Sequence, residues 1–282
     1  MLRSCLAMFV LCGTPVLARE GTGPAAQPES SPSWGMNPIW DDGLAEVATY
    51  EAGRTVYGKV RRFGTVLITV KEDFNETFHV KADSPYEGKR LLPILKLNVA
   101  SSIATENYPY HYLTSVFVRR DDVFRLVKLT NGSQEWCGNT FKLIRTWGDR
   151  PEFVFHSYWD GQGDGSYPLE WGEADLAEDQ LPIALRGLPF KVGYRRGCRL
   201  IDTQISNQAG APKPTDAEIR VVAEETVPSG AGRVPCWRVE VTRSGSTQRY
   251  WIEKAFPNIL VKFESPDGRS LFLKGRERRK YW

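Results

Sequence analysis

Residues 217–274 decide the fold, and they read AEIRVVAEETVPSGAGRVPCWRVEVTRSGSTQRYWIEKAFPNILVKFESPDGRSLFLK. Four successive runs in this stretch alternate apolar and polar residues, and turn residues separate them. In the second run, for example, the alternate positions are the apolar Trp237, Val239 and Val241. Successive side chains of a strand point to opposite faces, so a period of two is typical of a half-buried strand. The stretch therefore predicts an antiparallel meander whose last run is a hairpin turning at Pro266-Asp267-Gly268.

The residues before this meander also predict strands, because they continue the same alternation and are rich in β-branched and aromatic residues. Asn131-Gly132 lies between two such runs, and Asn-Gly is the strongest short hairpin signal because both turn positions need positive φ. A turn is therefore expected there. The expected strand regions are 45–61, 65–74, 77–82, 91–104, 111–120, 123–130, 133–147, 151–159 and 199–206.

One segment predicts a helix. Asp175 is a suitable N-cap for residues 174–188, ADLAEDQLPIALRGL, and Gly187 is a suitable terminator. Pro182 lies inside the run, so two short turns are the alternative. The fold class expected from all these patterns is mainly β. It is a large curved antiparallel sheet, an open or half-barrel meander in two sheet halves, with one or two short helices.

Composition limits the class of protein. Aromatic residues make up 12% of the 282 residues, which favours packed sheets. The formal net charge of +3 is too small to indicate a nucleic-acid partner. Basic residues gather at the C-terminus, which predicts either contact with an anionic surface or a solvated sheet edge protected from aggregation. These residues are Lys274, Arg276, Arg278, Arg279 and Lys280.

The N-terminus has the pattern of an export signal. A positive residue, Arg3, precedes an apolar run at 5–12, and small residues at 16–18 offer a cleavage site after Ala18. Lipidation at Cys12 or a retained anchor is the alternative. A signal peptide is therefore expected at 1–18, in an exported protein of the bacterial periplasm or cell envelope. A flexible tether rich in Pro, Ser and Gly is expected at 19–39. The β domain is expected at 40–282, with a subdivision near 165–198.

The cysteines leave two interpretations open. Cleavage would leave Cys137, Cys198 and Cys236, and an odd number cannot pair completely within one chain. An oxidising compartment permits a disulfide between Cys198 and Cys236. The alternative is that each is a small buried apolar residue, which suits Cys137 and Cys236 best.

The end of the chain resembles an uncharacterised bacterial envelope family. The resemblance rests on Cys236–Val241, Tyr250–Ile252 and Leu260–Glu264, which follow the family's order of an aromatic-R-V-E-V run, a Y-W-I/V run and a V-K-x-E run. These sheets resemble the open half-barrels of the periplasmic lipoprotein carriers. The resemblance implies a curved sheet with a concave face, and it supplies no catalytic residues.

The chain shows no motif for catalysis, for a cofactor or for a metal. His79, His111 and His156 lack metal-ligand spacing. Cys137 with His111 or His156 would make a thiol nucleophile and base, but nothing in the sequence brings them together. The loop at 160–165, DGQGDG, has the glycines and carboxylates of a calcium site but lacks the closing Glu, so a plain connecting loop is expected.

Two functional classes remain. The first is a non-enzymatic envelope protein that binds an apolar, lipid-like ligand or an envelope partner chain in the concave face of its sheet. The second is a hydrolase of envelope polymers whose catalytic residues the sequence does not identify. A purely structural envelope component is a third possibility, which the sequence does not separate from the first.

Overall fold

The computed structural model describes residues 33–148 and 150–282. Within them, sixteen strands form one open sheet whose edge strands are β9 and β10. All neighbours are antiparallel except β10 and β11, which are parallel. The expected mainly β fold with a large open sheet is therefore confirmed, and one parallel pair makes the sheet mixed.

The first half of the sheet contains β1 to β9. Its strands follow chain order from β1, and the short β3 pairs only with β2. The bounds are β1 (Ala45–Val56), β2 (Lys59–Asn75), β3 (Val80–Lys81), β4 (Leu91–Ile103), β5 (Tyr110–Arg119), β6 (Leu126–Glu135), β7 (Gly138–Arg145), β8 (Glu152–His156) and β9 (Asp164–Pro168).

The second half contains β10 to β16 and includes the predicted meander. The four alternating runs become β12 to β16, and the predicted turn at 266–268 closes the hairpin of the last two, with Gly268 at a φ of +87°. The bounds are β10 (Asp175–Ala177), β11 (Arg195–Ile201), β12 (Thr215–Ser229), β13 (Gly232–Arg243), β14 (Ser246–Glu253), β15 (Leu260–Glu264) and β16 (Ser270–Arg279).

The two halves join where the last strand pairs with the first. β16 lies between β15 and β1, with Ala45 opposite Arg279 and Gly53 opposite Ser270. The basic C-terminal residues therefore extend β16 along β1, beyond the end of its pairing with β15 at Phe272, and most of them are exposed. Three of these residues pair with acidic groups: Arg276 contacts Glu253, Arg278 Nη2 lies 2.6 Å from Asp42 Oδ1, and Arg279 Nε lies 2.8 Å from Glu277 Oε1.

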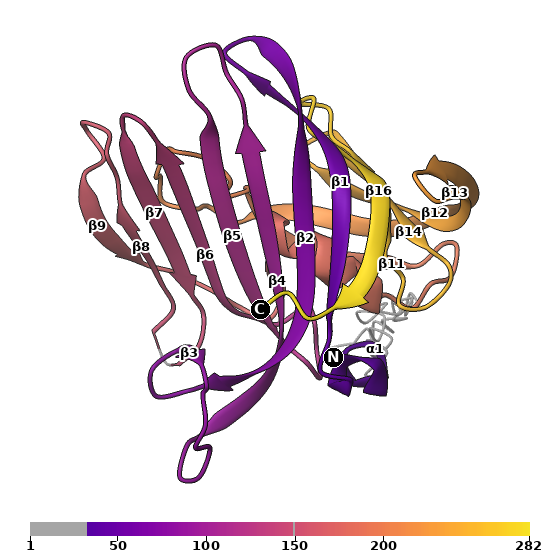
Figure 1. Cartoon of the computed structure of the whole chain (residues 1–282), viewed down its shortest axis with the longest axis horizontal. Helices are drawn as coiled ribbons and strands as arrows, with labels where there is room; N and C mark the ends of the chain where they lie inside the picture. The colour runs from indigo at the N-terminus through magenta and orange to yellow at the C-terminus, as the bar shows by residue number, and fades with distance from the viewer. Residues whose placement is uncertain (1–32, 149) are drawn as a thin grey trace, which may run out of the picture.

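The core lies between the two halves. Figure 1 shows β12 and β14 behind the first half, with their strands running across it. One cluster of buried residues takes side chains from both, among them Leu97 of β4, Ile144 of β7, Val221 of β12 and Val239 of β13. Each fully buried Leu, Ile or Val contributes about 1.5–3 kcal/mol through the hydrophobic effect. The sheet is thus folded over a shared apolar interior.

A short helical segment fills part of this interior, and we call residues 178–188 the plug. It consists of η2 (Glu178–Gln180), α2 (Leu181–Ala184), η3 (Leu185–Gly187) and Leu188. Leu181, Ile183 and Leu185 have no exposed surface. The predicted single helix over 174–188 is therefore wrong, and the alternative of short turns holds, with Pro182 in the first turn of α2. Asp175 is not the N-cap: it lies in β10 and pairs with Arg199 at 2.6 Å.

Two further sequence predictions need correction. Asn131-Gly132 lies inside β6 and forms no turn, and the β6–β7 turn is at 136–137. The reason is burial: Asn131 has no exposed surface, and its amide can donate to the carbonyl oxygens of Gln204 (2.8 Å) and Ser206 (3.2 Å). Tertiary hydrogen bonds therefore override the local turn signal.

The predicted tether also ends early. Residues 1–32, which include the predicted signal peptide, lie outside the described part of the chain. Residues 33–39 form α1 (Ser33–Met36) and the start of η1 (Pro38–Asp41). Trp34 is 5% exposed and its ring lies 5.1 Å from that of Trp40. The folded region therefore begins by residue 33, because two tryptophans pack into the core there.

Candidate functional site

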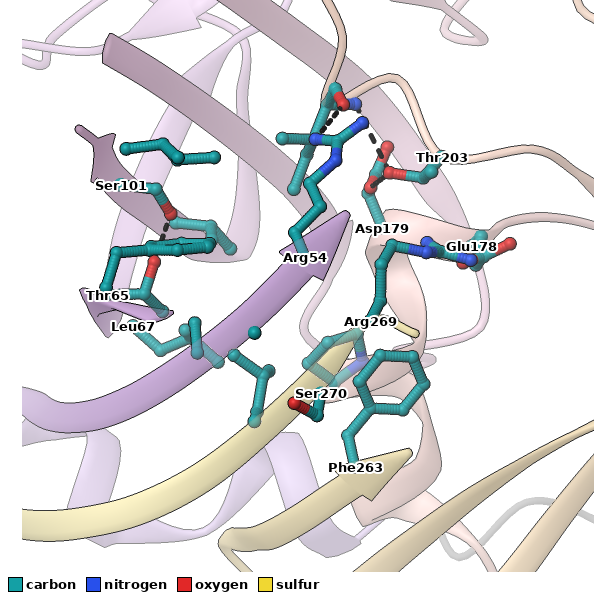
Figure 2. Close-up of a pocket in the computed structure, with 18 of the residues that line it drawn as sticks. Arg54, Thr65, Leu67, Ser101, Glu178, Asp179, Thr203, Phe263, Arg269 and Ser270 are labelled. Atoms are coloured by element: carbon teal, nitrogen blue, oxygen red, sulfur yellow. Dashed lines mark hydrogen bonds and ion pairs between the residues drawn. The ribbon is translucent and has the colours of Figure 1, made fainter. Parts of the chain in front are cut away.

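A cavity of about 110 Å³ opens to solvent beside the plug. Its walls come from β1, β2, β4, β14, β15, β16, the plug and residues 203–205, so it draws on both halves of the sheet. Most of its lining is apolar (Figure 2). The apolar residues include Leu67, Val99, Ile103, Tyr250, Phe263 and Leu271.

Strand alternation explains this lining. Thr65 and Leu67 are alternate residues of β2, and their neighbour Val66 points to the opposite face. Thr65 is paired in register with Ser101 of β4, and the two hydroxyls form a hydrogen bond in the cavity wall. The wall thus contains one pair of polar side chains that hydrogen-bond to each other within an apolar surface.

The charged side chains of the cavity gather at one end, and we call this the polar end. It contains Arg54, Glu178, Asp179, Thr203 and Arg269 (Figure 2). Arg54 Nη1 donates to the carbonyl oxygen of Ile205 at 2.6 Å, and no ion pair of Arg54 occurs within residues 33–148 and 150–282. Arg54 therefore keeps N–H groups for another acceptor.

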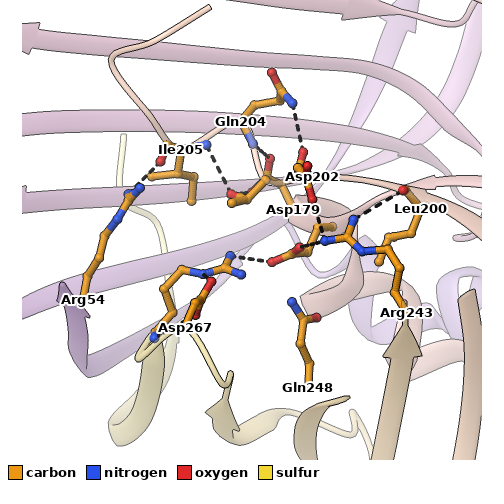
Figure 3. A network of polar contacts seen from close by, with 12 residues as sticks. Arg54, Asp179, Leu200, Asp202, Gln204, Ile205, Arg243, Gln248 and Asp267 are labelled. Atoms are coloured by element: carbon orange, nitrogen blue, oxygen red, sulfur yellow. Dashed lines mark hydrogen bonds and ion pairs between the residues drawn. The ribbon is translucent and has the colours of Figure 1, made fainter. Parts of the chain in front are cut away.

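Glu178 and Asp179 differ in their surroundings. Glu178 forms an ion pair with Arg269 and lies 3.7 Å from Arg243 Nη2, which in turn lies 2.5 Å from Asp202 Oδ1 (Figure 3). Asp179 instead accepts hydrogen bonds from Thr203 Oγ1 at 2.5 Å and from the backbone N–H of Gln204 at 2.6 Å. Burial raises the pKa of Asp179 to about 6, although these two hydrogen bonds oppose the rise.

Lys142 holds the same loop from the other side. Its Nζ donates to the carbonyl oxygens of Gln204 (2.5 Å), Ser206 (2.9 Å) and Gln208 (2.9 Å). Burial lowers the pKa of Lys142 to about 8, and the charge of Asp179 partly offsets this. Residues 203–208 are therefore fixed over the interior by one buried carboxyl and one buried amine.

We expect Asp179→Asn to remove a pH-dependent destabilisation. The pKa of about 6 in the folded protein lies above the ordinary 3.8, so the folded state binds a proton that the unfolded chain has released. Stability therefore falls as the pH rises from about 4 to about 6, and stays lower above that. Relative to the wild type, the variant should gain about 1–3 kcal/mol in the free energy of unfolding between pH 4 and 7.

Urea unfolding at several pH values measures this difference. The control is Asp83→Asn, because a hydrogen bond from Lys81 lowers the pKa of Asp83. That variant should show the opposite trend, losing stability relative to the wild type as the pH rises. Parallel curves for Asp179→Asn and the wild type would contradict the prediction.

The predicted disulfide is absent, since both Cys198 and Cys236 are free and buried. Cys198 is opposite Ala217 of β12, whereas Cys236 is opposite Glu225, eight residues further along the same strand. That offset is about 25 Å, and a disulfide needs Cα atoms within about 7 Å. Burial raises the pKa of Cys198 to about 11 and that of Cys236 to about 12, so both are unreactive apolar residues.

The remaining candidate residues lie apart from the cavity. Cys137 is exposed, so its interpretation as a buried apolar residue is wrong, and its Sγ lies 3.0 Å from the hydroxyl of Tyr108 rather than beside a histidine. His79 lies in the turn before β3, where its Nδ1 is 3.1 Å from Arg145 Nη1. His156 Nδ1 is 3.3 Å from Asp164 Oδ1, across the β8–β9 pair.

Residues 160–163 lie in the connection between β8 and β9, and Asp164 and Gly165 already belong to β9. A search of the described residues finds no group of three or more His, Cys, Asp or Glu that could hold a metal ion. The sequence did not single out the cavity, because its residues come from segments far apart in the chain. The acidic pair at 178–179 was its only visible signal, inside a run predicted as a helix.

Among residues 33–148 and 150–282, no helix is long and apolar enough to cross a membrane. Comparison with curated proteins gives no match, and neither does comparison with solved structures. The matched family model is described as "Protein of unknown function (DUF3108)", and it covers residues 175–274, from β10 into β16. The second half of the sheet is therefore similar to that uncharacterised family.

Proposed function

We propose that this chain is a non-enzymatic envelope protein that binds an apolar group, such as the end of a lipid acyl chain, in the cavity beside the plug. The cavity's lining carries the proposal, because its walls are apolar and its charged groups gather at one end. Ligand sites combine an apolar lining with a few placed polar groups in this way. The apolar part of the ligand would lie along Leu67, Val99 and Leu271.

The polar end supplies a place for the ligand's polar group. Arg54 points toward it, and its guanidinium is held by the Ile205 carbonyl rather than by a carboxylate (Figure 2). Arginine recognises carboxylate and phosphate groups through paired N–H donors. A fatty acid or an anionic lipid headgroup therefore suits the site.

The envelope location rests on the sequence. Residues 1–18 have a basic start, a short apolar run and small residues before Ala18, which is the pattern of an export signal. The match of residues 175–274 to an uncharacterised family adds no activity of its own. An envelope lipid is consequently the ligand class that agrees with both the cavity and the predicted location.

Ser101→Phe is the sharpest test of this proposal. Ser101 lines the cavity, so a phenyl ring there would occupy the space of the ligand. The neighbouring Ser102 lies on the opposite, exposed face of β4, which makes Ser102→Phe a matched control. We expect lipid extracted from purified wild type and from Ser102→Phe at near-stoichiometric amounts, and about ten-fold less from Ser101→Phe.

Mass spectrometry of solvent extracts from several expression hosts provides the measurement, and thermal unfolding confirms that each variant is folded. Equal lipid in the two phenylalanine variants would place the lipid elsewhere on the protein. Extracts without lipid from every host, together with no uptake of added fatty acid, would reject the proposal.

A further inference from the structure

Exposed aromatic side chains gather at one end of the first half of the sheet. Tyr57 lies in the β1–β2 turn, Trp136 in the β6–β7 turn and Tyr158 in the β8–β9 connection, and they are 70%, 79% and 53% exposed. In an antiparallel meander alternate connections lie at the same end, which is the upper end in Figure 1. We call these three residues, together with Tyr108 of the β4–β5 connection, the aromatic rim.

The rim is held in place by its own contacts. The Tyr108 ring stacks on Trp136 with centroids 5.8 Å apart, and the buried Tyr110 lies 5.4 Å from Tyr108 and 6.2 Å from Tyr57. Tyr158 packs on Gly138, where an added Cβ would lie 2.3 Å from the ring. These contacts join four connections into one aromatic surface. The side chains are already ordered, so binding would cost little conformational entropy.

Charges around the rim are nearly balanced. Glu106 of the β4–β5 connection contacts both Lys59, at 2.8 Å, and Arg61, at 2.5 Å. Arg62 lies 3.0 Å from Glu51. A balanced surface has no strong attraction for a highly charged partner, and Tyr and Trp favour the headgroup level of a bilayer, where one end of the ring is apolar and the other is hydrated.

We propose that the aromatic rim docks on the surface of a zwitterionic lipid bilayer, with Tyr57, Trp136 and Tyr158 at headgroup level. The rim is continuous with the cavity end of the sheet. Tyr112 lies 6.4 Å from Tyr110, and the Arg54 guanidinium lies 5.9 Å from the Tyr112 ring. Docking here would bring the polar end of the cavity close to the membrane, but docking itself does not require a ligand in the cavity.

Vesicle flotation of the full chain tests the proposal. Phosphatidylcholine vesicles are the probe, and the double variant Tyr57→Ser/Trp136→Ser removes the two most exposed rings of the aromatic rim. The matched control is Phe78→Ser/Tyr86→Ser, because these side chains are also exposed, at 74% and 48%, in the turn and loop around β3. We expect the partition coefficient to fall about ten-fold or more in the rim variant. It should stay within about two-fold of the wild type in the control.

The proposal would be overturned if the wild type did not float with the vesicles, or if the two double variants floated equally. It would also be overturned if the protein bound insoluble polysaccharide through Trp136 and did not bind vesicles. Binding that needs anionic lipid and is lost on neutralising Lys274 and Lys280 would assign the contact to the basic C-terminal segment instead. Ser101→Phe should float like the wild type, so failure of the cavity proposal and failure of the docking proposal are distinguishable. Thermal unfolding confirms that the variants are folded.

Discussion

Replacing Arg186 by alanine is expected to lower the free energy of unfolding by about 3–5 kcal/mol. Arg186, in the plug, forms a bidentate pair with Glu46 of β1, with both N–O distances at 2.8 Å. The two side chains are 3% and 6% exposed. Removing the guanidinium leaves a carboxylate buried without its partner, and the cost of that desolvated charge accounts for most of the loss.

Arg186 also connects the plug to the beginning of the folded chain. Its Nε donates to the Pro257 carbonyl at 3.0 Å, and its guanidinium lies 4.7 Å from the Trp34 ring and 5.5 Å from the Trp40 ring. The alanine variant therefore loses cation–π contacts in addition to the ion pair. These contacts explain why residues 33–40 are part of the fold.

Urea unfolding measures the effect of Arg186→Ala. The matched control is Arg62→Ala, because Arg62 pairs with Glu51 on the surface, where their side chains are 73% and 44% exposed. That pair should contribute at most about 1 kcal/mol. Arg186→Met combined with Glu46→Gln should lose less than Arg186→Ala, since no charge is left buried. A similar loss in Arg186→Ala and Arg62→Ala would contradict the interpretation.

Ile183→Ala is expected to cost about 2–5 kcal/mol, and Ile183→Val about 0.5–1.5 kcal/mol. Ile183 of α2 has no exposed surface and belongs to the cluster that joins the two halves of the sheet. The shorter side chain leaves a void that both halves would have to close. Because each half contributes walls to this interior, the backbone can collapse only partly.

Urea unfolding of the two Ile183 variants checks this size dependence. Val192→Ala serves as the control, because Val192 lies just after the plug and is 51% exposed. Its change should be within about 0.5 kcal/mol. If Ile183→Ala matched Val192→Ala, the plug would not be part of the stable core.

The sequence predicted the strands better than their arrangement. Alternation at 237–241 identified β13 correctly, because side-chain period is a local property that burial reveals. No local pattern predicted that β16 pairs with β1, because the choice of partner strand depends on the whole sheet. The turn predicted at Asn131-Gly132 is wrong for a related reason. The Asn131 amide can donate to the carbonyl groups of residues 204 and 206, which are distant in the chain, and these hydrogen bonds hold it inside the strand.

The candidate site was less predictable than the fold. Arg54, Ser101 and Asp179 lie on segments separated by scores of residues, and only the curvature of the sheet brings them to one cavity. The acidic Glu178 and Asp179 looked like the first turn of a helix, whereas one forms ion pairs and the other is buried with a raised pKa. Ion pairing and pKa depend on neighbouring side chains, and the sequence alone does not show which side chains are neighbours.

The pairing of β1 with β16 has a consequence for how the chain folds. The two strands are separated by more than two hundred residues, so β1 has one unpaired edge until β16 has formed and pairs with it. Long-range pairings form slowly, and an unpaired strand edge is open to other chains meanwhile. While the protein folds, this edge of β1 is therefore open to aggregation for as long as β16 has not paired with it.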